Sequence, residues 1–364
     1  MSSRSFNSKD GSANRRREPD EDLHDTSQMV EILQDTLKCG DRSTLRKKVR
    51  QLLTKTYRQP HSIDEVYPSL QEDLAQILNS RTLERAKYYA RRLIKSLTES
   101  KTNGLNDINL YRWKEYNDVL TDSLWTFDRR DTSGAHLGWY WGNFVPQIPH
   151  QVILRYTRRG DWVLDPFAGS GTTLIEGIRL GRNVIGLDIN EATVKRATKL
   201  IMREPNTLGA KVILEDGDST IMDFNDLCRR NHIARVQLVI MHPPYFDIIK
   251  FSNDSKDLSN STSVEKFLDE FGSVVRQVSS VLQDDRYLVL VAGDKYQNRE
   301  LIPLGFYMME VVMKNGFKLT GIIAKNFEDT RTKRDQKELW RYRALAGGFY
   351  VFKHEYVFVF KKSR

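Results

Sequence analysis

Residues 165–173, Asp-Pro-Phe-Ala-Gly-Ser-Gly-Thr-Thr, have the types and the spacing of a cofactor-binding loop. Gly169 and Gly171 would let the backbone approach a ligand closely, because neither residue carries a Cβ atom. A phosphate-binding loop would need a lysine here, and a dinucleotide-binding loop would need a third glycine where Leu174 stands. The loop opens instead with the carboxylate of Asp165, which suits a ligand that carries positive charge.

Regular elements on both sides would hold this loop in place. Residues 162–164, Trp-Val-Leu, are typical of a buried parallel strand, and residues 174–178 begin a helix that Thr172 or Thr173 would cap. A second predicted strand ends in Asp188, and a carboxylate at that position can accept hydrogen bonds from both hydroxyls of a ribose. A strand, a glycine turn and a helix N-terminus in this order predict a cofactor site in an α/β fold.

The loop resembles the cofactor motif of S-adenosylmethionine-dependent amino-methyltransferases that act on DNA, in which Asp-Pro-Phe-x-Gly-Ser-Gly-Thr-Thr is highly specific. The resemblance runs from about Gly134 to the C-terminus and leaves the N-terminal third uncovered. It implies a Rossmann-like class I methyltransferase fold, in which a doubly wound, mostly parallel sheet has an antiparallel last strand. It also implies S-adenosylmethionine as the cofactor.

Several site residues follow from the same resemblance. In the family, an element with Phe and Pro at this spacing precedes the glycine loop and completes the cofactor pocket. A later acid lies near the adenine amino group, and here that role falls on Asp218, with Asp216 as the competing candidate. The predicted cofactor-binding residues are Phe144, Pro146, Asp165, Phe167, Gly169, Gly171, Thr172, Asp188 and Asp218.

A further predicted strand, residues 236–241, ends in His242-Pro243-Pro244-Tyr245-Phe246, which we predict to be the catalytic turn. The lone pair of an exocyclic base amine is delocalised into the ring, and an enzyme can help by accepting hydrogen bonds from that amine. Consecutive prolines make the turn rigid and leave carbonyl groups without neighbouring N–H groups, so that an acceptor can face the substrate. Tyr245 offers a flat surface for a base that has left its stack.

His242 departs from the family pattern, which has Ser, Asp or Asn before Pro-Pro-Tyr as the acceptor for the target amine. A neutral imidazole nitrogen can accept one hydrogen bond if the tautomer is right, whereas an imidazolium cannot accept any. Ser at this place goes with cytosine N4, and Asp or Asn with adenine N6, so the histidine leaves both amines open. Phe246 resembles the cytosine group and favours cytosine N4.

The rest of the chain after the turn completes the predicted domain. Residues 247–262 are polar and predict a mobile loop over the substrate site, and Thr262 with Glu265 forms a capping box for an amphipathic helix. A fifth strand, a helix ended by Gly316 and two antiparallel closing strands follow. Between the closing strands, basic residues interleave with aromatic ones, which suits nucleic-acid contacts. The predicted DNA-binding residues are Arg331, Lys333, Arg334, Lys337, Arg341 and Arg343.

The N-terminal third has a different character. Residues 1–27 have almost nothing to bury and predict a disordered tail, and residues 28–130 predict a basic helical region. One helix in this region carries its basic residues away from its apolar face, where they serve either as a phosphate-contacting surface or as a solvated face. These residues are Arg81, Arg85, Lys87, Arg91, Arg92 and Lys95.

The composition of the chain limits the kinds of partner and cellular location that it fits. The chain has 364 residues and a formal net charge of +9, which favours a polyanionic partner such as nucleic acid. Cys39 and Cys228 make neither a disulfide framework nor a metal-ligand cluster, which fits a reducing, cytoplasmic location. No apolar run is long enough to span a membrane, and the N-terminus has no apolar signal core.

We therefore predict that residues 131–364 form a DNA methyltransferase domain acting on an exocyclic base amine, without a metal and without a covalent enzyme intermediate. A restriction-modification or defence role would make a cognate restriction endonuclease a candidate partner, and the oligomeric state stays open. Cytosine C5 methylation is disfavoured, because it needs an attacking thiolate and neither cysteine follows a proline beside the motifs. Two alternatives remain, an RNA base amino-methyltransferase and a non-catalytic nucleic-acid-binding protein with the same fold.

Overall fold

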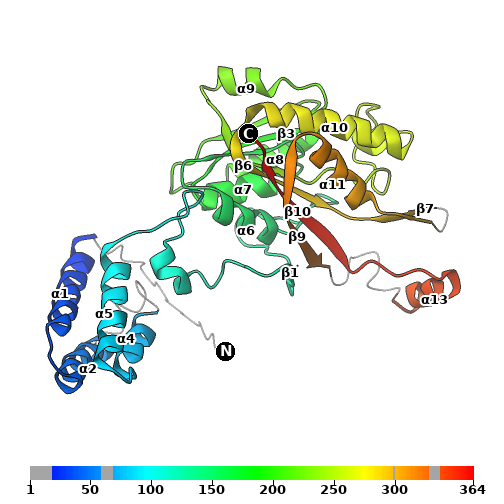
Figure 1. Ribbon diagram of the computed structural model, residues 1–364. Helices are drawn as coiled ribbons and strands as arrows, with labels where there is room; N and C mark the ends of the chain where they lie inside the picture. Colours follow the sequence, from blue (N-terminus) through cyan, green and yellow to red (C-terminus); the bar gives the residue numbers. More distant parts are fainter. Residues whose placement is uncertain (1–18, 59–68, 298–299, 328–336) are drawn as a thin grey trace, which may run out of the picture. The chain divides into compact units, whose positions relative to one another are not determined.

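The computed structural model describes residues 19–58, 69–297, 300–327 and 337–364 and divides the chain into two compact units (Figure 1). Unit 1 lies within Met1–Thr102 and Ile108–Asn117, and unit 2 comprises Asn103–Asp107 and Asp118–Arg364. The division therefore falls near residue 117, whereas the sequence analysis placed it at 130. Residues 118–130 belong to unit 2 because their strand β1 (Leu124–Trp125) joins the central sheet beside Ala324 and Lys325.

Unit 1 is a small helical bundle. Its elements are α1 (Pro19–Leu37), α2 (Arg42–Arg58), α4 (Leu70–Leu78), α5 (Leu83–Thr98) and the 3-10 helix η1 (Leu110–Glu115). Apolar residues from α1, α2, α4 and α5, among them Leu33, Leu45 and Leu74, form one buried core. Helix α1 begins at Pro19, so part of the predicted tail of residues 1–27 is helical, and residues 1–18 lie outside the described residues.

Unit 2 is an α/β domain with an eight-stranded sheet in the order β1-β9-β10-β6-β5-β2-β3-β4. Neighbouring strands from β4 to β6 run parallel, and β10 alone is antiparallel to both of its neighbours, β6 and β9. The predicted doubly wound, mostly parallel sheet with an antiparallel last strand is confirmed. The strands are β2 (Trp162–Asp165), β3 (Asn183–Asp188), β4 (Val212–Asp216), β5 (Val236–Met241), β6 (Leu282–Ala292), β9 (Phe317–Asn326) and β10 (His354–Lys362), with a separate hairpin of β7 (Lys295–Gln297) and β8 (Glu300–Ile302).

Helices cover both faces of this sheet (Figure 1). Alternate strand residues point to opposite faces, so Val163, Leu238 and Ile240 pack with α6 (Gln147–Tyr156), α7 (Thr172–Arg179) and α8 (Glu191–Ile201). Leu164 and Val239 belong to the core on the other face, with α9 (Phe224–Arg230), α10 (Val264–Val281) and α11 (Leu304–Lys314). The remaining elements are the 3-10 helix η2 (Leu258–Asn260) and α13 (Lys337–Gly347). None of the helices in the described ranges combines the length and the apolar character needed to cross a membrane.

Three helix ends test the predicted caps. Helix α7 begins after Gly171, which has a φ of +83° and no side chain, so neither Thr172 nor Thr173 is its cap. Helix α10 is capped by Ser263, whose hydroxyl accepts from the Lys266 N–H, so the predicted capping box at Thr262 is displaced by one residue. Gly316 follows the end of α11 with a φ of +88°, the left-handed conformation that glycine supplies at helix C-termini.

Candidate active site

A pocket in unit 2 is lined by both predicted motifs. Pro166–Gly169 come from the glycine loop after β2, and His242–Tyr245 come from the turn after β5. Both segments follow the carboxyl ends of adjacent parallel strands, the edge where open α/β sheets bind ligands. The pocket is a cleft partly open to solvent, and the space between its walls, with the open solvent included, is about 900 Å³.

Buried hydrogen bonds fix the shape of the glycine loop. The Asp165 carboxylate, 1% exposed, accepts from the Phe167 N–H at 3.0 Å and from the Thr173 hydroxyl at 2.5 Å. Gly169 has a φ of +52°, and a Cβ atom built there would lie 2.9 Å from the Tyr140 ring. Backbone conformation and space therefore both require glycine at residue 169.

Two carboxylates of the pocket follow neighbouring strands. Asp188, at the end of β3, accepts from the N–H groups of Gly169 and Asn190, each at 2.9 Å, while burial raises its pKa. Asp218, after β4, accepts from Thr220 through Oδ1 and lines the pocket. Asp216, the competing candidate, is exposed and lies outside the lining. Of the two acids, Asp218 is thus the one at the pocket.

Aromatic rings form another part of the pocket lining. Tyr140 is stacked on Phe251 with ring centroids 5.7 Å apart and an angle of 21° between the rings. Phe144 meets His242 edge to face at 4.9 Å. Flat apolar surfaces beside hydrogen-bond acceptors suit a planar heterocycle that carries amino and hydroxyl groups.

Hydrogen bonds tie the predicted catalytic turn to the C-terminal hairpin. His242 Nε2 lies 3.0 Å from the Tyr245 hydroxyl, which donates to Glu355 on β10 at 3.1 Å. Burial lowers the pKa of His242 to about 4, with Glu355 opposing this shift and Lys325 adding to it. The imidazole is therefore neutral near neutral pH and keeps one nitrogen lone pair as an acceptor.

Comparison with known proteins decides the family. The sequence model of the "DNA methylase" family with N6 and N4 specificity matches residues 31–199 and 236–364, which is most of the chain. The chain belongs to this DNA methylase family. The match begins within unit 1, so it reaches further towards the N-terminus than the resemblance that started near Gly134.

Individual relatives of the methylase match over shorter stretches. The type II methyltransferase M2.LlaDCHI of Lactococcus lactis subsp. cremoris is 29% identical over 150 residues, 38% of this chain and 56% of the relative. The type II methyltransferase M2.DpnII of Streptococcus pneumoniae is 46% identical over 57 residues, 16% of this chain and 21% of the relative. A probable tRNA (guanine(10)-N2)-dimethyltransferase of Methanothermococcus thermolithotrophicus is 27% identical over 144 residues, 40% of this chain and 77% of the relative. The matched segments thus span about half or less of the two type II methyltransferases.

The structure of the methylase divides the predicted site residues into two groups. Those that line the pocket are Phe144, Phe167, Gly169, Asp188, Asp218, His242, Pro243, Pro244 and Tyr245. Those outside the lining are Pro146, Asp165, Gly171, Thr172 and Phe246.

The residues outside the lining support its shape. Pro146 stands at the start of α6, and a Cβ atom on Gly171 would lie 2.7 Å from Ile201. Thr172 is buried at the first position of α7. Phe246 is buried against Phe267, with ring centroids 6.0 Å apart, so it packs in the core instead of facing a substrate.

Several pocket residues escaped the sequence analysis. Nothing in the sequence indicates that Tyr140 and Phe251 stack on each other and line the pocket. Asp257 is buried at the pocket wall and accepts from Ser252 and Ser259, which holds residues 251–260 in a hydrogen-bonded turn. This segment was predicted as a polar, mobile loop over the substrate site, without a role for Asp257. The Asp257 position could have been found as the acceptor at the start of the short 3-10 helix η2.

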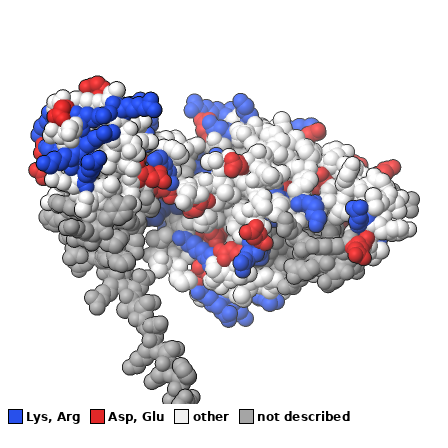
Figure 2. Space-filling model, turned by 90° about the horizontal axis from the view of Figure 1, so that it is seen from below, with Lys and Arg blue, Asp and Glu red and all other residues white. Residues whose placement is uncertain are grey.

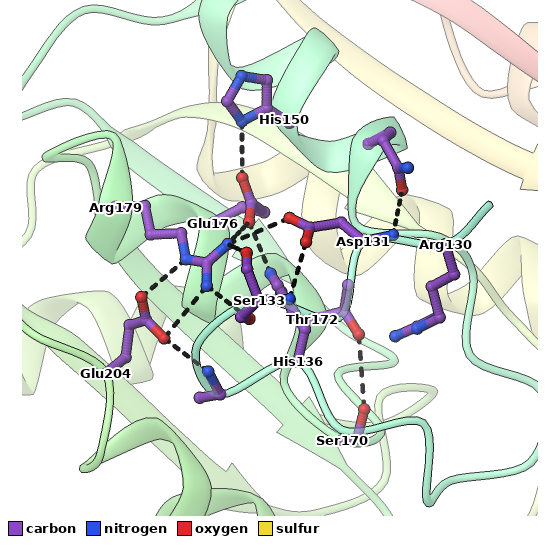
Figure 3. A network of polar contacts seen from close by, with 12 residues as sticks. Arg130, Asp131, Ser133, His136, His150, Ser170, Thr172, Glu176, Arg179 and Glu204 are labelled. Carbon is purple, nitrogen blue, oxygen red and sulfur yellow. Dashed lines mark hydrogen bonds and ion pairs between the residues drawn. The ribbon is translucent and has the colours of Figure 1, made fainter. Parts of the chain in front are cut away.

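A buried polar network lies under the glycine loop (Figure 3). Both oxygens of Glu176 on α7 are engaged, one by His136 Nε2 at 2.6 Å and the other by His150 Nδ1 of α6 at 2.7 Å. Arg179 joins the same cluster, 3.2 Å from Glu176 and 3.3 Å from Asp131. The network ties α6, α7 and residues 131–136 together beside the pocket.

The same cluster brings one ligand atom each from Asp131, His136 and Glu176 within 4.8 Å of one another, a spacing that a metal ion could use. The Arg179 guanidinium already supplies positive charge to two of these carboxylates. A cation added at that position would be repelled by Arg179. We therefore interpret the cluster as an ion-pair network that supports α7.

Most of the predicted DNA-binding residues lie in or next to the segment 328–336, outside the described residues. Arg331, Lys333 and Arg334 lie outside the described residues, and for Lys337 only the backbone position at the start of α13 is described. Arg341 and Arg343 are exposed on α13, and the Arg343 guanidinium lies 5.2 Å from the centre of the Trp340 ring. On this helix, the alternation of basic and aromatic residues in the sequence thus brings a basic side chain over an aromatic ring.

Replacing Asp165 with asparagine should change how the stability depends on pH. Burial raises the pKa of Asp165 to about 7, whereas an aspartate in the unfolded chain titrates near pH ~3.9. Between these values the folded protein holds one proton more than the unfolded chain. The wild-type free energy of unfolding, relative to that of Asp165→Asn, should therefore fall by up to about 1.4 kcal/mol per pH unit from about pH 4 to 7 and then level off. Urea unfolding of both proteins across this range measures the difference, and a constant difference would contradict the burial of a titrating carboxyl here.

Proposed function

We propose that this methylase transfers the methyl group of S-adenosylmethionine to an exocyclic amine of a DNA base at specific sites. The observation that carries the proposal is the meeting of the glycine loop and the His-Pro-Pro-Tyr turn in one pocket. One motif suits a nucleotide-like cofactor with positive charge, and the other suits an amine that must be made more nucleophilic. The two motifs occupy adjacent strands, so a methyl donor and a target amine could be held side by side.

The donor set of the pocket fits S-adenosylmethionine. Asp188 can accept from ribose hydroxyls, Asp218 from an adenine amino group, and the ring of Tyr140 lies against Gly169. When bound, this cofactor supplies a methyl group on a positively charged sulfur. The protein's own contribution is to hold the target amine in line with that methyl group and to accept its hydrogen bonds at His242 and the proline carbonyls.

DNA as the partner is supported by charge. Helix α2 carries Lys and Arg along its length without an acidic residue, and exposed basic residues also lie just before and along α5. These residues are Arg81, Arg85, Arg91 and Lys95. Lys and Arg side chains crowd the helical unit in the space-filling view (Figure 2). Such surfaces bind nucleic-acid backbones through phosphate contacts, independently of sequence.

The finer specificity is part of the proposal. We expect cytosine N4 before adenine N6, on the resemblance of the His242–Phe246 turn to the cytosine group, although Phe246 itself lies in the core. A restriction-modification or defence role, with a cognate endonuclease as partner, would match the names of the type II relatives. Methylation of an RNA base amine is the second candidate, because one relative is named as a tRNA dimethyltransferase.

Methyl transfer with labelled S-adenosylmethionine tests these alternatives. Purified protein is incubated with duplex DNA or with RNA, and the products are digested to nucleosides, with Tyr245→Ala as the inactive control. We expect label in N4-methylcytosine from DNA. Label in N6-methyladenine would correct the amine, and label in RNA alone would transfer the function to the second candidate. Cofactor binding without transfer to either polymer would favour a non-catalytic protein.

A further inference from the structure

A chain of hydrogen bonds leads from the catalytic turn to a buried ion pair on the C-terminal hairpin. His242 Nε2 contacts the Tyr245 hydroxyl at 3.0 Å, and that hydroxyl donates to Glu355 Oε2 at 3.1 Å. The other carboxylate oxygen of Glu355 lies 3.1 Å from Lys325 Nζ. Lys325 on β9 and Glu355 on β10 are direct partners across the antiparallel pair, and their side chains are only 6% and 9% exposed.

The chemistry of these groups fixes the direction of each hydrogen bond. A tyrosine hydroxyl has one proton to donate, and an ionised carboxylate can only accept. Because Glu355 is paired with the Lys325 ammonium and ionised, it accepts the hydrogen bond that the Tyr245 hydroxyl donates, and the hydroxyl oxygen must then accept from His242. In a neutral imidazole this places the proton on Nε2 and leaves the lone pair on Nδ1.

We propose that the Lys325–Glu355 pair acts through Tyr245 to hold His242 in its Nε2–H tautomer, which leaves Nδ1 to accept a hydrogen bond from the target amine. Lys325 and Glu355 are positioning residues in this arrangement, and the inference rests on the proposed function in so far as the acceptor serves an amine. The opposite tautomer would present an N–H group to an N–H donor and would oppose substrate binding.

Apart from the hydrogen-bonded chain of Tyr245, Glu355 and Lys325, the contacts of the His242 ring within the described residues carry no charge. Phe144 packs on the imidazole edge to face and is uncharged. The charged groups that act on the ring are Glu355 and Lys325. Asp294, after β6, acts on Tyr245 together with Glu355. Burial keeps the pKa of His242 low, at about 4, so the ring is neutral and its tautomer matters at neutral pH.

Glu355→Gln should reverse the direction of each hydrogen bond between residue 355, Tyr245 and His242 without changing the positions of the side chains. The Lys325 ammonium holds the amide oxygen towards itself, so the amide NH2 group faces Tyr245 and donates to its oxygen. Tyr245 must then donate to His242 Nε2, which moves the imidazole proton to Nδ1 and removes the acceptor. We expect the single-turnover rate of methyl transfer to fall by about tenfold to a hundredfold, the effect of one lost hydrogen bond to a reacting group, with unchanged affinity for S-adenosylmethionine.

Nitrogen NMR of 15N-histidine-labelled protein reads the tautomer directly at about pH 7.5. The His242 signals are assigned by their loss in His242→Asn. We expect the Nε2–H form in the wild type and the Nδ1–H form in Glu355→Gln. The matched control is Glu310→Gln, an exposed glutamate on α11 that pairs with Lys314 and should leave both the tautomer and the rate unchanged.

A second background separates positioning from a merely structural role. In His242→Ser, the serine hydroxyl can rotate and accept whichever way Tyr245 points, so adding Glu355→Gln should change the rate little. A double-mutant cycle compares the rate loss caused by Glu355→Gln in the wild type with the loss in the His242→Ser background, and equal losses would overturn the inference. An Nδ1–H tautomer in the wild type would overturn it as well, even if Glu355→Gln fails to fold. The wild-type spectrum needs no methyl transfer, so failure of the proposed function would leave this result readable.

Discussion

His242→Ala should lower the single-turnover rate of methyl transfer by on the order of 10²-fold at about pH 8, because the target amine loses a preorganised acceptor. His242→Asn and His242→Ser should retain much of the activity, since each offers an oxygen acceptor in place of the imidazole nitrogen. Rapid-quench measurement of one turnover isolates the chemical step from product release. The matched control is His354→Ala, which removes an imidazole from a Tyr356 hydroxyl at 3.1 Å but lies outside the pocket lining.

The pH dependence of this step sharpens the same test. A histidine with an ordinary pKa would make the rate fall below pH ~6.5. The sequence around His242 gives no reason to expect a different pKa. Burial lowers the pKa of His242 to about 4, so the neutral acceptor form persists down to that pH and the fall in rate moves with it. A wild-type rate that halves near pH ~6.5 would contradict the lowered pKa of His242. A His242→Ala rate that equals the wild-type rate would remove His242 from the mechanism. The proline carbonyls would then be the remaining acceptors of the turn.

Asp188→Ala should weaken the binding of S-adenosylmethionine by about tenfold to more than a hundredfold. Loss of a hydrogen bond to a charged group costs about 1.5–3 kcal/mol, and here the tether from Asp188 to the Gly169 N–H is lost as well. Calorimetric titration of the folded variant measures the change. Wild-type affinity would remove Asp188 from the cofactor site.

Asp216→Ala provides the matched control for this measurement. Asp216 ends the neighbouring strand β4 in register with Asp188, and its side chain is exposed outside the pocket lining. The two variants therefore remove the same group from equivalent strand ends. Only the loss at Asp188 should affect the cofactor, and the comparison separates a specific contact from the general loss of negative charge.

Asp165 shows how the structure changes a role predicted from the motif. As the first residue of the loop it was a candidate for direct contact with the cofactor. Its carboxylate is instead buried beneath the loop and engaged by Phe167 and Thr173. Its replacement would therefore act on cofactor binding through the shape of the loop, whereas Asp188 can act on the ligand itself.

The sequence by itself determined the strand-by-strand order of the domain and the two motifs that meet in the pocket. Local signals carry this information: apolar runs predict the buried strands, and the glycines and the paired prolines have fixed conformational effects. The same signals led to the antiparallel closing hairpin. Helix starts were less well predicted, because Thr172, Thr173 and Thr262 all have capping chemistry and only the backbone geometry selects Gly171 and Ser263 instead.

Only the tertiary structure decided which side chains face the pocket, and which protonation state and hydrogen-bond partners they have there. Phe246 is the last residue of the predicted catalytic turn, yet its side chain lies in the core, whereas Phe251 lines the pocket wall. Lys325 and Glu355 carry no motif, and they reach Tyr245 because antiparallel pairing of β9 and β10 sets them opposite each other. Burial, hydrogen-bond direction and pKa depend on atoms that are distant in the sequence, so the pattern of residues around His242 could raise the question of its tautomer but could not answer it.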